Sequence, residues 1–415
     1  MKRIIVVGGG FGGLWSAVGA ARKLREEGVG QGGVEVVLVN PRKYHSIRVR
    51  NYESDLACTL VPLADVLDPI GVKHVEGEVV DIETSAQIVV IRTAEEEIEL
   101  PYSKLILASG SQLVRPPIPG LAQHAHDIDT YEAALRLQDH LRGLADRHTK
   151  PGRFTAIVVG AGLTGIELAL ELPERLRAVA QGAADSDASK SIRVILADRS
   201  PRIGEAMGDA RPVIERACQA LGVELWPNFA VQSIGESDVI LASGEQVPAS
   251  TVVWCGGMRA HPLNERLAVE LDRLGRVPVD HFMRVEGISN VFAAGDAANA
   301  KIDGEHASVM SCQHARPMGR FAGHNAASEL LGLPMLPLNI DWYTTILDLG
   351  PWGAVYTEGW DRRLVAEGAV AKQTKIVINR ERIYPPRTGN REDILSAGAP
   401  AIQRPPAYGG TVGKS

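Results

Sequence analysis

Two patterns of apolar and polar residues alternate along this chain, and their order predicts an α/β fold. A run of β-branched residues at 3–7 has the composition of a buried strand and leads directly into the glycine-rich stretch 8–13. Residues 14–24 then place apolar side chains on one side of a helix. The same order of strand, glycine turn and helix returns at 155–159 and 160–167. The chain therefore carries two copies of one strand–turn–helix unit.

Other apolar runs extend these two units. Further strands are predicted at 34–40, 102–110, 192–198, 251–257 and 290–296, a crossover strand and meander over 72–100, and helices at 130–146 and 311–331. The polar stretch 181–190 is predicted to be an exposed loop. The last segment holds β-like runs at 343–347, 354–356 and 375–378, and the tail 385–415 is predicted to be extended or disordered beyond its start.

The repeated unit predicts an α/β protein with two Rossmann-like nucleotide-binding domains, the second inserted in the first, and a small C-terminal α+β segment. A proline-rich break at 114–120 marks the first boundary. The predicted parts are 1–118 and 271–336 for the first domain, 119–270 for the inserted domain, 337–386 for the C-terminal segment and 387–415 for a flexible tail.

Composition excludes several classes of protein. The 415 residues carry a formal net charge of −6, which leaves no basic excess for nucleic acid as the main partner. The four cysteines form no CxxC pair, so a disulfide framework, a redox dithiol and a metal site are not expected. No apolar run approaches the roughly 20 residues that span a bilayer, and the N-terminus is used as a strand. We expect a cytoplasmic protein, with peripheral attachment at the inner face of the membrane as an alternative.

The glycine turns carry the chemistry of dinucleotide binding. Gly8 allows the sharp turn, Gly10 lets a pyrophosphate approach the backbone, and Gly13 lets helix and strand pack closely. The pyrophosphate then lies at the positive end of the helix. Gly160, Gly162 and Gly165 take these positions in the second turn, and Phe11, Gly12, Gly110 and Gly256 are further candidates for cofactor contact.

Two strand ends are placed to bind adenosine ribose. Asn40 ends the second strand, where Asp or Glu is usual. We therefore expect a neutral amide, in place of a carboxylate, to contact the ribose; the alternative is that Asn40 is an ordinary turn residue. Asp198 ends the corresponding strand of the second unit, which favours NADH and repels a 2′-phosphate. Arg199 could accept that phosphate, so NADPH is the alternative. Val80 is expected to offer its backbone to the adenine.

The motifs GGGFGG, LASG, GAGLTGIE and VFAAGDAA, in this order, resemble those of the FAD/NAD(P) flavoprotein reductases of the pyridine nucleotide–disulfide oxidoreductase superfamily. Within it, the chain looks most like type II NADH dehydrogenases. The resemblance implies FAD in the first domain and NADH, or NADPH, in the second, with hydride passing from the nicotinamide to the flavin. It also implies that Gly295 and Asp296 bind the ribityl chain, that Glu167 faces the nicotinamide, and that Gln313 lies near flavin and acceptor. The alternatives are a helix N-cap for Asp296, a helix-dipole effect for Glu167 and a solvated helix start for Gln313.

The chain departs from this family at two places. Cys312 stands where type II NADH dehydrogenases usually have alanine, and a reactive thiol there is an alternative to an ordinary small buried residue. No basic amphipathic helix is evident near the end of the chain. The leading hypothesis is electron transfer from NADH to a quinone-like acceptor; the alternatives are an oxidoreductase for a specific metabolite and a non-enzymatic NADH sensor. The sequence does not determine the oligomeric state, and a homodimer is one possibility.

The last segment is rich in aromatic residues for a chain in which they make up 5%. One interpretation is the core of a small interface domain, and the other is an aromatic wall suited to a flat acceptor. Both can hold together. The residues are Trp342, Tyr343, Trp352, Tyr356 and Trp360.

Overall fold

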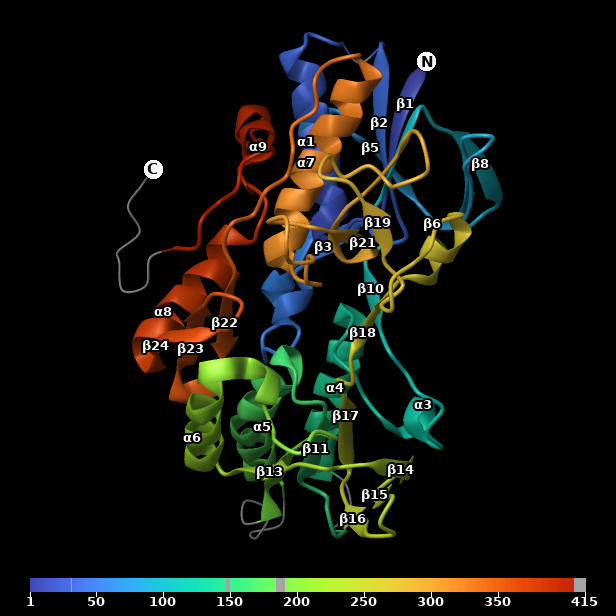
Figure 1. Ribbon diagram of the computed structural model, residues 1–415. Coiled ribbons are helices and arrows are strands. Elements are labelled where there is room, and N and C mark those ends of the chain that lie inside the picture. The colour runs from blue at the N-terminus through green and yellow to red at the C-terminus, as the bar shows by residue number, and fades with distance from the viewer. Residues whose placement is uncertain (31, 147–149, 184–190, 407–415) are drawn as a thin grey trace.

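A computed structural model describes residues 1–30, 32–146, 150–183 and 191–406. Its N-terminal lobe, at the top of Figure 1, is built on a five-stranded parallel sheet in the order β20-β9-β1-β2-β5. The β-branched run predicted near the N-terminus is its central strand, with Ile4, Ile5 and Val6 fully buried. The strands are β1 (Lys2–Val7), β2 (Val34–Asn40), β5 (Lys73–Glu76), β9 (Lys104–Leu107) and β20 (Val291–Ala293).

Two helices, α1 (Phe11–Glu26) and α7 (Cys312–Leu330), lie side by side in this lobe (Figure 1). Glycines let their backbones approach closely. A Cβ added at Gly319 would lie 2.3 Å from the Gly12 carbonyl oxygen, and one at Gly323 would lie 2.0 Å from that of Ser16. The glycines of α7 are therefore required by helix packing.

The second lobe, at the bottom of Figure 1, repeats the plan on a four-stranded parallel sheet in the order β13-β12-β11-β17. Helix α4 begins after Thr130, whose side chain accepts a hydrogen bond from the Ala133 N–H and so caps it. The main elements are β11 (Thr155–Val159), β12 (Arg193–Ala197), β13 (Val223–Trp226), β17 (Thr251–Trp254), α4 (Tyr131–Gly143), α5 (Leu163–Gln181) and α6 (Arg211–Leu221).

The chain leaves and re-enters the first lobe through one antiparallel pair, β10 (Ser111–Leu113) and β18 (Met258–Ala260). Because β20 follows β18 in the sequence and pairs with β9, the first sheet is completed by residues on both sides of the second. The predicted fold class, with one Rossmann-like unit inserted in the other, is confirmed. The residue limits given for each domain stay predictions.

Small antiparallel sheets flank the two lobes. The meander predicted over 72–100 is confirmed as β6-β7-β8. The remaining elements are β3 (Tyr44–Ser46), β4 (Leu60–Pro62), α2 (Leu63–Leu67), β6 (Glu78–Glu83), β7 (Ile88–Arg92), β8 (Glu97–Pro101), α3 (Leu121–His124), β14 (Val231–Ile234), β15 (Asp238–Leu241), β16 (Gln246–Pro248), β19 (Val277–Val279) and β21 (Ala298–Ala300).

The C-terminal segment packs beside both lobes, as the red elements of Figure 1 show. Its sheet is β22 (Thr344–Asp348), β23 (Ala354–Glu358) and β24 (Arg363–Glu367), which matches the first two predicted β runs. The third run was wrong, because residues 375–378 belong to α8 (Gly368–Val377) and the π-helical turn Ile378–Arg382. The helical spacing of Ala371, Thr374 and Lys375 buries these side chains, and this packing overrides the strand preference of the β-branched run.

The prediction of an extended tail was also wrong in part, since α9 (Arg391–Ala397) forms within it. The Asn390 side chain caps α9 by accepting hydrogen bonds from the Glu392 and Asp393 N–H groups. Ile394 and Leu395 are buried in the core that includes α1. Helix α5 runs to Gln181, while residues 184–190 of the predicted loop and 407–415 of the tail lie outside the described residues.

Candidate active site

The first glycine turn has the geometry that dinucleotide binding requires. Gly8 has φ +102°, and a Cβ there would lie 2.3 Å from the Ala108 carbonyl oxygen. A Cβ at Gly13 would lie 1.8 Å from the Gly8 carbonyl oxygen, whereas one at Gly10 would meet none of the described atoms within 4 Å. Gly8 and Gly13 are thus fixed by packing within the protein, and Gly10 faces open space where a ligand could approach.

The second turn has the same pattern of glycine conformations and close backbone contacts. Gly160 has φ +113°, and a Cβ at Gly165 would lie 1.8 Å from the Gly160 carbonyl oxygen. A Cβ at Gly162 would again meet no described atom within 4 Å. Gly10 and Gly162 occupy the N-cap positions of helices α1 and α5, and no described side chain caps either helix. Both helix N-termini are therefore free to donate N–H groups to an anion.

The two strand-end residues occupy equivalent positions. Asn40 Oδ1 accepts a hydrogen bond from the Gly9 N–H at 2.8 Å, and Asp198 Oδ2 accepts one from the Ala161 N–H at 2.8 Å. Asp198 Oδ1 also accepts one from the Ser200 N–H. Although burial raises the pKa of the Asp198 carboxyl, these donors outweigh it and hold the pKa below its ordinary value. The second turn thus carries a negative charge where the first carries a neutral amide.

Asp296 follows β20 and lies at the junction of the two lobes. Its Oδ2 accepts a hydrogen bond from the Ser111 hydroxyl at 2.6 Å, and Ser111 belongs to β10. Burial raises the pKa of the Asp296 carboxyl, while Ser111 and Arg48 act to lower it. Ala294 occupies the N-cap of the short 3₁₀ turn and Gly295 precedes Asp296 within it, so the alternative of an N-cap role for Asp296 is wrong.

Helix α7 points its N-terminus at the C-terminal sheet. No described side chain caps this helix, and the buried Ser311 hydroxyl has no hydrogen-bond partner among the described residues. The Thr344 hydroxyl of β22 donates a hydrogen bond to Gln313 Oε1 at 3.2 Å. Gln313 is half-buried, which argues against a fully solvated helix start. Burial raises the pKa of the Cys312 thiol, which argues against a reactive thiolate there.

Glu167 forms a buried ion pair that the sequence did not reveal. Its carboxylate Oε1 lies 2.7 Å from Lys375 Nζ and accepts a hydrogen bond from the Asp348 N–H at 3.0 Å. Both side chains of the pair are only 8% exposed. Burial raises the pKa of the Glu167 carboxyl, although Lys375 acts to lower it. This pair joins α5 to α8, so Glu167 does more than interact with a helix dipole.

Further polar groups extend this pair. Lys372 Nζ lies 2.5 Å from Asp348 Oδ1, and the Tyr52 hydroxyl donates a hydrogen bond to Asp348 Oδ2 at 3.2 Å. Asn379 Nδ2 in turn donates a hydrogen bond to the Tyr52 oxygen at 3.3 Å. Sequence reasoning missed all of these residues. The available signal was Lys375, a single basic residue before the apolar run 376–378.

Glu171, one turn after Glu167 on α5, makes a pH-dependent contribution to stability. Burial, reinforced by Asp348, raises the pKa of this carboxyl to about 7. Because the folded state holds the proton more tightly than the unfolded state, stability falls as pH rises between the ordinary value and about 7. We expect Glu171→Gln to raise the free energy of unfolding by roughly 2 kcal/mol at pH 8 and to have little effect at pH 4. Urea denaturation at both pH values tests this; equal effects would contradict it.

Three other positions were predicted to contact a cofactor. Gly110 has φ +76° and precedes β10, and its carbonyl accepts a hydrogen bond from the His261 N–H at 3.0 Å. A Cβ at Gly256 would lie 2.6 Å from the Trp254 ring, so packing inside the protein requires this glycine. Val80 lies at the register shift in β6, outside the five-stranded sheet. The cofactor roles of all three stay predictions.

The aromatic residues of the last segment divide between the two interpretations. Tyr356 is 1% exposed and belongs to the core of the C-terminal sheet. Tyr343 and Trp360 instead stack with centroids 4.4 Å apart, and His306 stacks on the Trp360 ring at 4.3 Å. His314, in the first turn of α7, also approaches both Tyr343 and Trp360. The stacked rings therefore lie at the same end of α7 as Gln313.

Comparison with known proteins agrees with this geometry. The profile of the pyridine nucleotide-disulphide oxidoreductases matches residues 2–319. The chain belongs to this family. It is a flavin-dependent pyridine-nucleotide oxidoreductase close to the type II NADH dehydrogenases, as the motifs predicted. The C-terminal segment that supplies Lys375 lies beyond the matched residues.

Individual proteins are similar over nearly the whole chain. An NADH dehydrogenase-like protein of Mycobacterium tuberculosis is 51% identical, over 98% of this chain and all of the relative. A demethylphylloquinone reductase of Synechocystis is 28% identical over 85% of this chain and 86% of the relative. The structure of NDH2 from Plasmodium falciparum in complex with NADH superposes with a TM-score of 0.78 at 13% identity, covering 96% of this chain and 97% of that one. At this identity the structural match supports the fold alone.

Proposed function

We propose that this protein is an FAD-dependent oxidoreductase that oxidises NADH and reduces a quinone-like acceptor. The observation that carries the proposal is the pair of open glycine turns, one in each lobe. The buried Glu167–Lys375 pair and the Gln313–Thr344 hydrogen bond connect the two lobes to the C-terminal segment. Two nucleotide sites in one chain serve transfer between two bound dinucleotides. The names of the relatives, which include quinone reductases, support the choice of acceptor.

The residues present fit a flavin dinucleotide in the first lobe. Gly10 leaves room for the pyrophosphate, and Asp296 offers a carboxylate to a ribityl hydroxyl. The Ser311 hydroxyl, which has no partner among the described residues, offers a further hydrogen bond. When bound, such a flavin would accept hydride from the nicotinamide and pass two electrons to the acceptor. The free N–H groups at the start of α7 would stabilise negative charge at the flavin ring.

The C-terminal segment completes the proposed site. Lys375 holds the carboxylate of Glu167 in one position, and Thr344 orients the amide of Gln313. The stacked Tyr343 and Trp360 rings form an apolar side wall suited to a flat acceptor. Among the described residues, no helix is long and apolar enough to cross a membrane. We propose that the protein acts in the cytoplasm or at a membrane surface.

The test is spectroscopic and kinetic. The purified protein should show the two visible absorption bands of oxidised flavin, lose them on addition of NADH under anaerobic conditions, and regain them on addition of menadione. Steady-state rates should follow ping-pong kinetics. A protein without flavin bands would overturn the proposal. Flavin that NADH reduces but that quinones do not reoxidise would favour the alternative, an oxidoreductase acting on a specific metabolite.

The charge of Asp198 is expected to set the preference for NADH. In Asp198→Asn the side-chain oxygen can still accept the Ala161 N–H, but the negative charge that would repel a 2′-phosphate is lost. The ratio of kcat/KM for NADH to that for NADPH should fall at least about tenfold. Stopped-flow reduction with each nucleotide measures this ratio. An unchanged ratio would show that Asp198 lies away from the ribose.

A further inference from the structure

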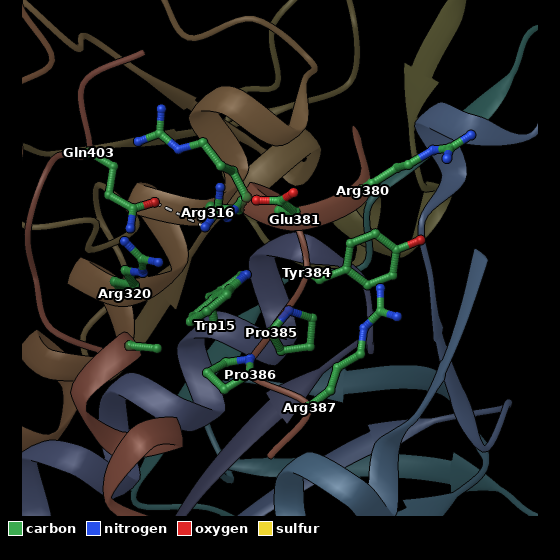
Figure 2. A pocket seen from close by; sticks show the side chains of 12 residues that line it. Trp15, Arg316, Arg320, Arg380, Glu381, Tyr384, Pro385, Pro386, Arg387 and Gln403 are labelled. Atoms are coloured by element: carbon green, nitrogen blue, oxygen red, sulfur yellow. Dashed lines mark hydrogen bonds between the residues drawn. The ribbon is translucent and has the colours of Figure 1, made fainter. Parts of the chain in front are cut away.

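A basic cavity of about 450 Å³ lies outside the site described above, between the α1–α7 pair and the segment 380–403. Figure 2 shows it from close by, with Arg316, Arg320 and Gln403 beside the Trp15 ring. We call it the arginine cavity, because Arg316, Arg320, Arg380, Arg382 and Arg387 line it around Trp15. Glu381 is the one carboxylate on this lining within the described part of the chain. The concentration of positive charge is unusual for a chain of net charge −6.

Arg320 is buried and Arg316 is half-buried, and neither has a counterion among the described residues. Arg320 is 3% exposed, and its Nε atom, like that of Arg316, is buried with no hydrogen-bond partner among the described residues. Arg316 donates one hydrogen bond to Gln403 Oε1 at 3.1 Å, a neutral acceptor. Within the described chain, neither guanidinium has a carboxylate within 4 Å. Buried charges are normally paired, so a bound anion would stabilise this arrangement.

The electrostatics of the two guanidiniums agree with their geometry. Burial, reinforced by the neighbouring Arg316, lowers the pKa of Arg320 to about 9. Burial also lowers the pKa of Arg316 to about 10. The face of Trp15 compensates in part, since the Arg320 guanidinium carbon lies 4.3 Å from its ring centroid and that of Arg316 lies 5.3 Å away. An anion between the two guanidiniums would remove both penalties.

We propose that the arginine cavity binds a phosphate-bearing anion. The Arg316 and Arg320 guanidiniums, which both lie against the Trp15 ring, suit a group with several charged acceptor oxygens, and Arg binds phosphate through paired hydrogen bonds. The volume admits a substituted phosphate and exceeds the need of a single carboxylate. Because Arg316 and Arg320 lie one and two turns after Gln313 on α7, the bound phosphate would lie along the helix that leads to the proposed acceptor site. A soluble phosphate ester and a phospholipid headgroup share this chemistry.

The first experiment uses the flavin-loaded protein and inorganic phosphate. Phosphate should raise the melting temperature relative to sodium chloride of equal ionic strength, and calorimetry should show saturable binding. Arg320→Met should bind phosphate at least about tenfold more weakly and lose the shift. Without phosphate, Arg320→Met should melt at the same or a higher temperature, because an unpaired buried charge is removed. That combination separates loss of a binding site from loss of the fold.

Two further variants sharpen the comparison. Arg387→Gln changes an exposed rim residue and should weaken phosphate binding less than Arg320→Met does. Arg92→Gln changes an exposed arginine on β7 and should leave it unchanged. Phosphate bound at the glycine turns would persist in Arg320→Met. An equal phosphate shift in wild type and Arg320→Met would therefore overturn the proposal.

Vesicle flotation identifies the source of the phosphate. Binding to vesicles of phosphatidylglycerol in phosphatidylcholine, but not of phosphatidylcholine alone, would assign the site to a lipid headgroup if Arg320→Met abolishes it. Saturable binding of inorganic phosphate without flotation would assign it to a soluble phosphate ester. Failure of the wild type to respond in either assay would overturn the proposal. None of these readouts depends on turnover, so the result is independent of the proposed function.

Discussion

Lys375→Met is expected to lower the free energy of unfolding by about 3–5 kcal/mol at pH 8, because it leaves the Glu167 carboxylate buried without its ion-pair partner. The loss should be smaller at pH 5. Without Lys375, the pKa of Glu167, already raised by burial, rises further, and protonation removes the buried charge below that value. The destabilisation is therefore present at high pH and relieved as pH falls. Urea denaturation of both proteins at the two pH values measures it.

The double variant Glu167→Gln/Lys375→Met is the control for this prediction. It removes both charges, so it should recover most of the stability that the single variant loses at pH 8. Lys372→Met, which removes a more exposed lysine from Asp348, should cost less than Lys375→Met. A double variant as unstable as Lys375→Met would show that lost packing, and not the unpaired carboxylate, is responsible.

Gly162→Ala is expected to raise the KM for NADH at least about tenfold without lowering the melting temperature. A Cβ at this position meets open space inside the protein, so the fold should tolerate it, but the methyl group would occupy the space where a pyrophosphate approaches the helix start. Reoxidation of chemically reduced flavin by menadione should be unchanged, since it needs no nucleotide. Stopped-flow measurement of the two half-reactions separates these effects.

Gly165→Ala and Gly143→Ala are matched controls. At Gly165 the added Cβ would lie 1.8 Å from the Gly160 carbonyl oxygen, so the melting temperature should fall together with NADH binding. Gly143, at the end of α4, also faces open space among the described residues, and its replacement should affect neither NADH binding nor flavin reduction. An NADH KM in Gly162→Ala equal to that of wild type would place the nucleotide elsewhere.

The predictions that succeeded depended on local patterns. The two glycine turns were recognised because a close backbone approach admits only glycine at Gly8, Gly13, Gly160 and Gly165, whatever the rest of the chain does. The parallel strands were recognised because strands covered on both faces carry continuous apolar runs, as β1 does over residues 4–7 and β11 over residues 156–159. The inserted second lobe followed from the repeat and from the position of the Gly295–Asp296 element after it.

The predictions that failed concerned the C-terminal segment, where local preference and tertiary packing disagree. The run 375–378 has strand-like residues, yet helical spacing lets Ala371, Thr374 and Lys375 pack against β22 and β23. Helix α9 is short and forms where Ile394 and Leu395 find an apolar surface on α1. Whether a side chain in this segment is buried depends on contacts with residues distant in the sequence. A local sequence pattern therefore cannot predict these helices.

The sequence by itself determined the two glycine turns, the strands and helices that flank them, and the family. Tertiary structure decided the partners of the site residues. Glu167 and Lys375 are 208 residues apart in the sequence, and only folding makes them a buried pair. Arg316 and Arg320 look like ordinary polar positions of a helix in the sequence. In the fold they line a cavity closed by segment 380–403, and the buried Nε atom of each has no hydrogen-bond partner among the described residues. Long-range ion pairs and cavities form where segments distant in the sequence pack together, and these contacts cannot be inferred from the local sequence.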